Sequence, residues 1–381
     1  MVASSKFRAV AALTAIAALV LAGPASSQVS ASERQQAARE HPQVLAQFGG
    51  AYDGPQQRYL EEVGRRMADA AGIPGGCTFT LVSSDVVNAF AVPGCYVYVT
   101  RGLMSIANSE DELAFVLGHE IGHIAAKHSK KRQQRSLLTG LGALLLGAVT
   151  KNDNIAQLLG QGAQLYTLSF SRTQEYEADD LGSRYLARAG YSAQGAGDML
   201  DDLQRHDALI ARTTGRDAKA VPQWASTHPL AAERVRRASS QAQAAGARNV
   251  EPQRERYLAA VDGLLFGDDP AQGFVQGRSF VHPQLRIAFD APQGFTLSNS
   301  PQAVQIEGPN GMKALFGGGG LQNGSLDAYA EAVLRQTVGQ SSTQLGRAER
   351  TVINGLDAVV LPARVQTDGG VADLTVAAYR T

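Results

Sequence analysis

The residues best suited to chemistry form one short run, His119-Glu120-Ile121-Gly122-His123. Histidines four residues apart lie on the same face of a helix, so both imidazoles can reach one metal ion. The glutamate between them then lies near the open side of that ion, where it can accept a proton from water. This spacing predicts a catalytic zinc site with His119 and His123 as ligands and Glu120 as general base.

A catalytic zinc ion needs a third protein ligand, and the acidic run that begins at Glu175 offers one. Glu175 and Asp179 are four residues apart and share one face of a predicted helix. We therefore expect Glu175 to bind the metal and Asp179 to hydrogen-bond a ligand histidine. Gly182 continues this face and would let the two helices approach closely. The alternative is a solvated acidic face, which we expect for Glu177 and Asp180.

Two helices must carry these residues, and each is preceded by a helix-start signal. Ser109-Glu110-Asp111-Glu112 is a capping-box sequence that predicts the helix of the first motif. Ser171-Arg172-Thr173-Gln174 predicts a second helix, which runs to Ala189 and ends at Gly190. Proline is favoured at the first helical position, so Pro229 predicts a further helix from there to about residue 245.

The chain before these helices predicts two helices followed by a small sheet. Residues 31 to 72 carry apolar residues at helical spacing, and Pro74-Gly75-Gly76 breaks the second helix. Residues 77 to 100 have a β pattern with a turn at Pro93-Gly94. Cys77 and Cys95 both fall in this region, and the sequence leaves open a disulfide across the hairpin or two buried thiols.

These motifs together resemble the M48 metallopeptidases, which include the CAAX prenyl protease, heat-shock membrane protease and periplasmic outer-membrane-assembly protease branches. The resemblance spans about residues 35 to 245. Four motifs carry it in order: Asn88-Ala89-Phe90-Ala91 followed by Pro93-Gly94, the segment Leu113 to His128, the Ser-Arg-x-x-Glu-x-x-Ala-Asp-x-x-Gly form at Ser171 to Gly182, and Thr-His-Pro-x-x-x-x-Arg at Thr227 to Arg234.

The resemblance implies a mainly helical, gluzincin-type peptidase domain with a small β-sheet and one Zn²⁺ per chain. It implies that Glu175 is the third ligand and that Asp179 supports the site. It also places His228 and Arg234 at the active site, where His228 would stabilise the oxyanion or cap the zinc in a resting state. Without the resemblance, a histidine before a proline is more often a surface residue. Cys95 departs from the family, which would have glycine there.

The rest of the chain fits an exported protein that folds in water. Its residues are 44% hydrophobic and 18% charged, which is typical of a globular chain. The formal net charge is zero, which argues against nucleic acid as a partner. Residues 1–27 have the basic, apolar and small-residue regions of a cleaved signal peptide, so with the resemblance we expect a periplasmic protein. The alternative is an uncleaved anchor helix, although the apolar run is short for a membrane span.

Three further segments complete the predicted organisation. Leu137 to Val149 is apolar, glycine-interrupted and too short to span a bilayer, so it is either a buried helical hairpin or a site of peripheral membrane contact. Residues 247–279 are expected to be a linker with some ordered contacts. Residues 280–381 predict a smaller α+β domain with a helix at Leu326 to Val338, weakly similar to PsbP-like modules.

The sequence therefore predicts an α+β protein with a signal peptide, a zinc metallopeptidase domain over residues 31–246, a linker and a C-terminal domain. The expected activity is endoproteolysis of unfolded or misassembled envelope proteins. The alternative is a zinc-bound chaperone or assembly factor with little proteolysis, and a third reading is a structural zinc module. The intact Glu120 favours the protease, because neither other class needs a base there.

Overall fold

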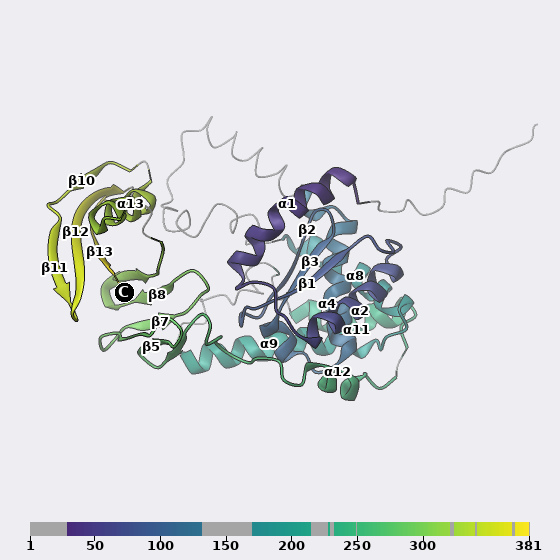
Figure 1. The fold of residues 1–381 in the computed structure, drawn as a ribbon. Coiled ribbons are helices and arrows are strands. Elements are labelled where there is room, and N and C mark those ends of the chain that lie inside the picture. Colours follow the sequence, from purple (N-terminus) through teal and green to yellow (C-terminus); the bar gives the residue numbers. More distant parts are fainter. Residues whose placement is uncertain are drawn as a thin grey trace, which may run out of the picture.

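The computed structural model describes residues 29–131, 170–214, 228, 232–248, 250–320, 324–339, 341–367 and 370–380. The expected signal peptide and the apolar segment Leu137 to Val149 lie outside the described residues. Within them, a mainly helical part with one small sheet is followed by a β-rich part (Figure 1), which confirms the predicted α+β class. No helix of the described residues is both long and apolar enough to cross a membrane.

The helical part follows the predicted order of elements. Its elements are α1 (Ala31–Gln47), α2 (Pro55–Ala70), β1 (Thr78–Val82), β2 (Ala89–Val92), β3 (Tyr96–Thr100), α3 (Arg101–Ile106), α4 (Glu110–Ala125), α8 (Arg172–Arg188), α9 (Gln194–Thr214), α11 (Ala232–Ala244) and α12 (Arg254–Val261). Sequence reasoning did not anticipate the short helix α3.

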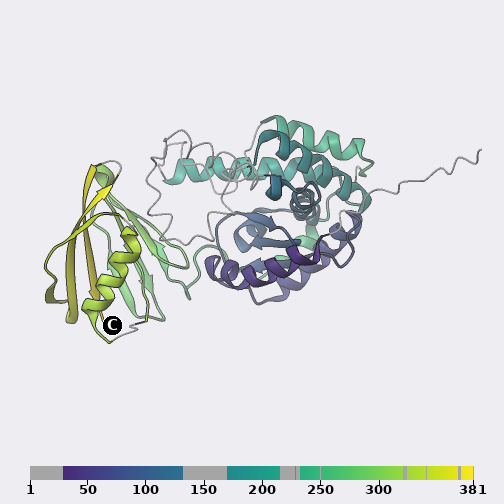
Figure 2. The same cartoon turned by 90° about the horizontal axis from the view of Figure 1, so that it is seen from above.

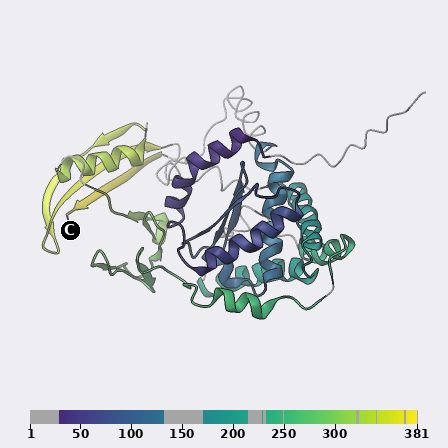
Figure 3. The ribbon, with the colours of Figure 1, turned by 45° about the vertical axis from the view of Figure 1, so that its right-hand side comes forward.

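The small sheet lies between helices on both of its faces. Its strand order is β1-β3-β2, with β1 parallel and β2 antiparallel to β3, so β2 is an edge strand. Side chains alternate along each strand. On one face, Leu81 and Val99 join the main core with α2 and α4. On the other face, Val82, Phe90 and Tyr98 pack against α1, which lies along the sheet (Figure 3).

The turn between β2 and β3 explains why glycine would be favoured at the position of Cys95. Gly94 and Cys95 have φ angles of 94° and 58°, in the left-handed region where a side chain is disfavoured. Cys95 forms a disulfide with Cys77, at a Cα–Cα separation of 4.6 Å. The backbone amide of Thr78 also donates to the carbonyl of Cys95. The disulfide thus ties the β2–β3 turn to the start of β1.

Helices α4 and α8 approach each other through glycines. A methyl group on Gly182 would lie 2.9 Å from the backbone nitrogen of His119, and one on Gly122 would lie 3.0 Å from the carbonyl oxygen of Ala178. Such distances leave no room for a side chain, so the two backbones are nearly in contact. The expectation that Gly182 permits a close approach is met, and the predicted metal-binding faces of α4 and α8 are opposite each other.

Three buried acidic residues fix the start of α4. Glu110 accepts hydrogen bonds from Tyr59 and Tyr191, and Asp111 accepts from the backbone amides of Ser192 and Gln253. Ser109 caps the helix through the amide of Glu112, as predicted. The carboxylate of Glu112 accepts from the amide of Asn108 rather than from that of Ser109, so the capping box is shifted by one residue. By contrast, the box at Ser171 and Gln174 is complete.

The β-rich part has its own core. Its elements are β4 (Phe274–Gln276), β5 (Ser279–His282), β6 (Ile287–Asp290), β7 (Thr296–Ser298), β8 (Val304–Glu307), β9 (Lys313–Phe316), α13 (Leu326–Val338), β10 (Thr343–Leu345), β11 (Glu349–Ile353), β12 (Leu356–Thr367) and β13 (Gly370–Tyr379). Helix α13, which has the predicted bounds, packs on the sheet that contains the paired strands β12 and β13 (Figure 2).

The segment expected to be a linker, residues 247–279, contains regular structure. Helix α12 lies within it, and the Tyr257 side chain of that helix is fully buried in the main core. Strand β4 also lies within it. The β-rich part contacts α1 through Gln302, whose side chain donates to the carbonyl of Ala46 at 2.8 Å. The domain boundaries stay a prediction.

Candidate metal centre

Four side chains from three parts of the chain converge on one point. His119 and His123 come from α4, Glu175 comes from the first turn of α8, and His228 precedes α11. Their ligand atoms all lie within 4.8 Å of one another, and each side chain is at most 1% exposed. This group combines the three ligands predicted from spacing with a histidine that the family resemblance alone had placed at the site.

The distances within this group fit a tetrahedral zinc ion. The two Nε2 atoms of His119 and His123 are 3.0 Å apart, and carboxylate oxygens of Glu175 lie 3.6 Å from the first and 3.5 Å from the second. Zinc bonds of about 2.0–2.2 Å in tetrahedral geometry place ligand atoms about 3.3 Å apart. The observed separations are therefore close to those that one shared zinc ion would impose.

The hydrogen bond of His119 supports the same conclusion. Nδ1 of His119 lies 2.9 Å from Oδ1 of Asp179. Because a carboxylate only accepts, Nδ1 carries the hydrogen and Nε2 of the neutral ring presents a lone pair toward His123. The predicted supporting role of Asp179 has a geometric basis, since its bond fixes the tautomer that a metal ligand requires.

His228 occupies the place of a fourth ligand. Its Nδ1 lies 3.2 Å from Nε2 of His119 and 3.2 Å from Oε1 of Glu175. Its Nε2 lies 3.5 Å from a carboxylate oxygen of Glu120. With His228 in this position, all four corners of a tetrahedral site are filled by protein atoms.

Glu120 is buried beside the four ligands and only partly satisfied. Its side chain is 1% exposed, and its Oε1 accepts no hydrogen bond from the described residues. Burial raises its pKa, while electrostatic interactions with His228 and His119 and the hydrogen bond from the backbone amide of Ala91 act in the opposite direction. A buried carboxylate with a raised pKa and a free lone pair is suited to accept and return a proton.

Arg234 holds the two carboxylates of α8. Its Nη1 lies 2.6 Å from Oε2 of Glu175, while Nε and Nη2 bind both oxygens of Asp179. Burial would raise the pKa of Asp179, but the charge and hydrogen bonds of Arg234 outweigh it and lower that pKa. The pKa of Glu175 is also lowered well below its usual value, because His228 and His123 outweigh its burial. Both groups are therefore ionised.

Sequence reasoning missed two residues that contact His123. The ring of Phe170 stacks on it with a centroid distance of 3.9 Å. The buried Nδ1 of His128 lies 2.8 Å from its Nδ1, and Nε2 of His128 lies 3.1 Å from Glu177. Glu177 was expected on a solvated face; its side chain is half exposed yet has this buried partner. A histidine five residues after the motif was the only signal available.

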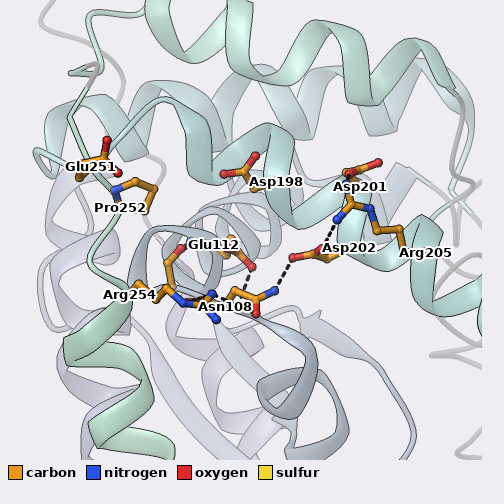
Figure 4. Close-up of a pocket in the computed structure, with 10 residues that line it drawn as sticks. Asn108, Glu112, Asp198, Asp201, Asp202, Arg205, Glu251, Pro252 and Arg254 are labelled. Carbon is orange, nitrogen blue, oxygen red and sulfur yellow. Dashed lines mark hydrogen bonds and ion pairs between the residues drawn. The ribbon is translucent and has the colours of Figure 1, made fainter.

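A cavity lies at the N-terminal end of α4, away from the four converging side chains, and contains none of the predicted site residues. Its volume is about 390 Å³. There Asn108 links Glu112 to Asp202 (Figure 4). Burial, together with the nearby carboxylates of Asp202 and Asp198, raises the pKa of Glu112 to about 7. The cavity is lined by Asn108, Ser109, Glu112, Asp198, Asp201, Asp202, Arg205, Glu251, Pro252 and Arg254.

Comparisons with known proteins agree with the geometry. The model of peptidase family M48 matches residues 55–242. The chain is 31% identical over 201 residues to the beta-barrel assembly-enhancing protease of Yersinia pestis and 30% identical over 212 residues to that of Escherichia coli K12. These alignments cover 50% and 53% of this chain and 40% and 42% of the relatives.

A mitochondrial relative matches a shorter stretch. The metalloendopeptidase OMA1 of Bos taurus is 32% identical over 159 residues, which is 39% of this chain and 29% of that protein. The chain thus spans less than half the length of the curated relatives it matches. The matched segment nevertheless contains all the converging side chains, so the similarity to peptidase family M48 covers the whole candidate metal centre.

Proposed function

We propose that this protein is a zinc-dependent endopeptidase with one zinc ion held by His119, His123 and Glu175. The observation that carries the proposal is the convergence of these three buried ligands beside the partly unsatisfied carboxylate of Glu120. Two histidines and one glutamate form a ligand set of catalytic zinc, whereas structural zinc is usually closed by four cysteine or histidine ligands.

Glu120 is the proposed general base. Zinc bound at this site would lower the pKa of water and polarise a peptide carbonyl. Glu120 would then accept a proton from the attacking water and return it to the leaving amine. Asp179 keeps His119 in the ligand tautomer, and Arg234 holds Asp179 and Glu175 in place.

The proposed substrates are unfolded or misassembled envelope proteins. Strand β2 lies at the sheet edge and packs against α4, and the amide of Ala91 in this strand interacts with Glu120. An extended polypeptide can pair with such an edge through its own backbone, which a folded surface cannot do. The expected signal peptide supports a periplasmic location, and the names of the bacterial relatives, which refer to beta-barrel assembly, support an envelope substrate.

His228 gives the site a proposed resting state. Its Nδ1 lies where water and substrate would enter, so it must move before cleavage. Once displaced from the metal, it would be available to stabilise the oxyanion. The filled fourth position is also the observation that favours the second candidate, a zinc-bound chaperone or assembly factor with little proteolysis.

Replacing the proposed base distinguishes the two candidates. Glu120→Gln keeps the shape of the side chain and removes the proton acceptor. We expect the variant to retain one zinc ion per chain and to lose cleavage of an unfolded substrate such as casein. The matched control is Asp180→Asn, a similar change at a half-exposed carboxylate of α8. Equal casein turnover by Glu120→Gln and the unmodified protein would exclude the proposed mechanism.

A further inference from the structure

A chain of hydrogen-bonding groups runs from His123 toward the surface. Nδ1 of His123 lies 2.8 Å from Nδ1 of His128, whose Nε2 lies 3.1 Å from Oε2 of Glu177. The side chain of His128 is fully buried and that of Glu177 is half exposed. The chain therefore connects a proposed metal ligand on α4 with a carboxylate on α8.

The donors and acceptors along this chain can be assigned. The carboxylate of Glu177 accepts, so Nε2 of His128 carries a hydrogen. A neutral imidazole has only one, so Nδ1 of His128 is an acceptor and must receive the Nδ1 hydrogen of His123. That assignment leaves the lone pair of His123 on Nε2, which is the atom 3.0 Å from Nε2 of His119. Each bond in the chain thus favours the tautomer of His123 that binds a metal.

The backbone makes a specific turn to place His128. Residues five apart in a helix point about 140° away from each other, so a continuous α4 would keep His128 away from His123. Helix α4 ends at Ala125, Lys127 has a φ of 55°, and a new helical segment begins at His128. A non-glycine residue in the left-handed region costs about 1–2 kcal/mol. The contact between the two histidines is therefore made at the expense of local backbone strain.

The hydrogen bonds that orient His123 are similar to those that orient the other proposed ligand, His119. His119 is oriented by Asp179, which Arg234 holds in turn. We propose that His128 and Glu177 are positioning residues that orient His123 for zinc, as Asp179 and Arg234 orient His119. The inference rests on the proposed zinc site and extends it to two residues outside the ligand set. Outer partners of metal ligands typically change metal affinity by about 10- to 100-fold.

Two substitutions at His128 separate hydrogen bonding from packing. His128→Leu fills a similar volume but cannot accept a hydrogen bond, whereas His128→Asn places an acceptor near the former Nδ1 position. We expect zinc affinity, measured by competition with a chelator, to fall about 10- to 100-fold in His128→Leu. His128→Asn should recover most of that loss. The cobalt-substituted leucine variant should show an altered visible absorption spectrum, which reports ligand geometry.

Glu177 provides an independent variant at a position that tolerates change. Glu177→Ala removes the acceptor of Nε2 in His128, and we expect a loss of at most about tenfold in zinc affinity. Asp180→Ala is the matched control, because Asp180 is a carboxylate of similar exposure on the same helix, paired with Arg237 at 3.8 Å. Its zinc affinity should equal that of the unmodified protein.

The outcomes also separate this inference from the proposed function. Unchanged zinc affinity and an unchanged cobalt spectrum in both His128→Leu and Glu177→Ala would overturn the positioning role of His128 and Glu177. The proposed function would still stand if Glu120→Gln were inactive and loaded with zinc. An unmodified protein that retains no zinc would overturn both the proposed function and the positioning role. Circular dichroism of the zinc-free variants checks that each is folded before zinc is added.

Discussion

Arg234 binds both carboxylate oxygens of Asp179, with Nε 2.7 Å from Oδ2 and Nη2 2.8 Å from Oδ1. The same guanidinium group also reaches Glu175, so one cation from α11 pairs with two buried carboxylates of α8. Planar, two-pronged pairing of this kind is available to arginine and not to lysine. The pairing makes α11 part of the metal centre although it supplies no ligand.

Arg234→Ala is expected to destabilise the fold by about 3–5 kcal/mol, because it leaves two buried carboxylates without their cation. Urea unfolding of the zinc-free protein measures the loss. Arg236→Ala on the same helix is the control, since Arg236 is 70% exposed and its ion pair contributes little. A loss below 1 kcal/mol in Arg234→Ala would show that the carboxylates find other partners.

His228→Ala is expected to retain zinc and to cleave casein faster than the unmodified protein. Three ligands remain, and the fourth position becomes open to water. Metal analysis and an initial-rate assay test the two halves of the prediction. Loss of zinc would mean that His228 is a required ligand, and a slower rate with zinc retained would favour an oxyanion role over a capping role.

Gly182→Ala is expected to weaken both zinc binding and the fold. The new methyl group would lie 2.9 Å from the nitrogen of His119, so α8 must move away from α4. Overpacking of this kind costs about 1–3 kcal/mol, more than the helical preference of alanine restores. Gly320→Ala, where nothing lies within 4 Å, is the control. The prediction would be contradicted if Gly182→Ala had the same thermal unfolding temperature and the same zinc affinity, measured by chelator competition, as the unmodified protein.

Glu112 is expected to make the fold less stable as pH rises. Its pKa is about 7 when folded and near its usual value of 4.5 when unfolded, mainly because of burial. The folded state therefore binds this proton more tightly. Stability is full below pH 4.5 and falls until about pH 7, by about 3 kcal/mol in all.

The comparison of the unmodified protein with Glu112→Gln isolates this effect. Asp198 and Asp202 of α9 and Arg254 of α12 surround the group and stay the same in both proteins. Denaturant unfolding at pH 5 and pH 8 should show a larger loss in the unmodified protein than in the variant. If both proteins lost the same stability between pH 5 and pH 8, the proton responsible would be bound by a group other than Glu112.

The sequence predicted the parts of the site that depend on local spacing. His119 and His123 share a helix face because the period of the helix requires it, and Ser109 and Ser171 start the two helices as expected. Glu175 and Asp179 could be assigned because they too are four residues apart. His228 and Arg234 could not, because their positions depend on how α11 packs, and only the family resemblance indicated them.

Other features depend on backbone geometry that no periodic pattern encodes. His128 reaches His123 only through the left-handed turn at Lys127. Helix α12 was not predicted because it lies in a segment whose composition resembles a linker. The burial of Tyr257 depends on how this helix packs against the main core. The pairing of Cys77 with Cys95 depends on a strand register that the sequence alone left open.

Helix α1 has a practical meaning for recombinant work. It begins soon after the expected cleavage site, and its Ala37 and Val44 seal one side of the sheet over Val82, Phe90 and Tyr98. A shortened chain that starts after Gln47 would present this apolar surface to water, where such patches promote self-association. Expression trials that trim the mature N-terminus should therefore yield aggregated material, while those that begin near Val29 should yield monodisperse protein.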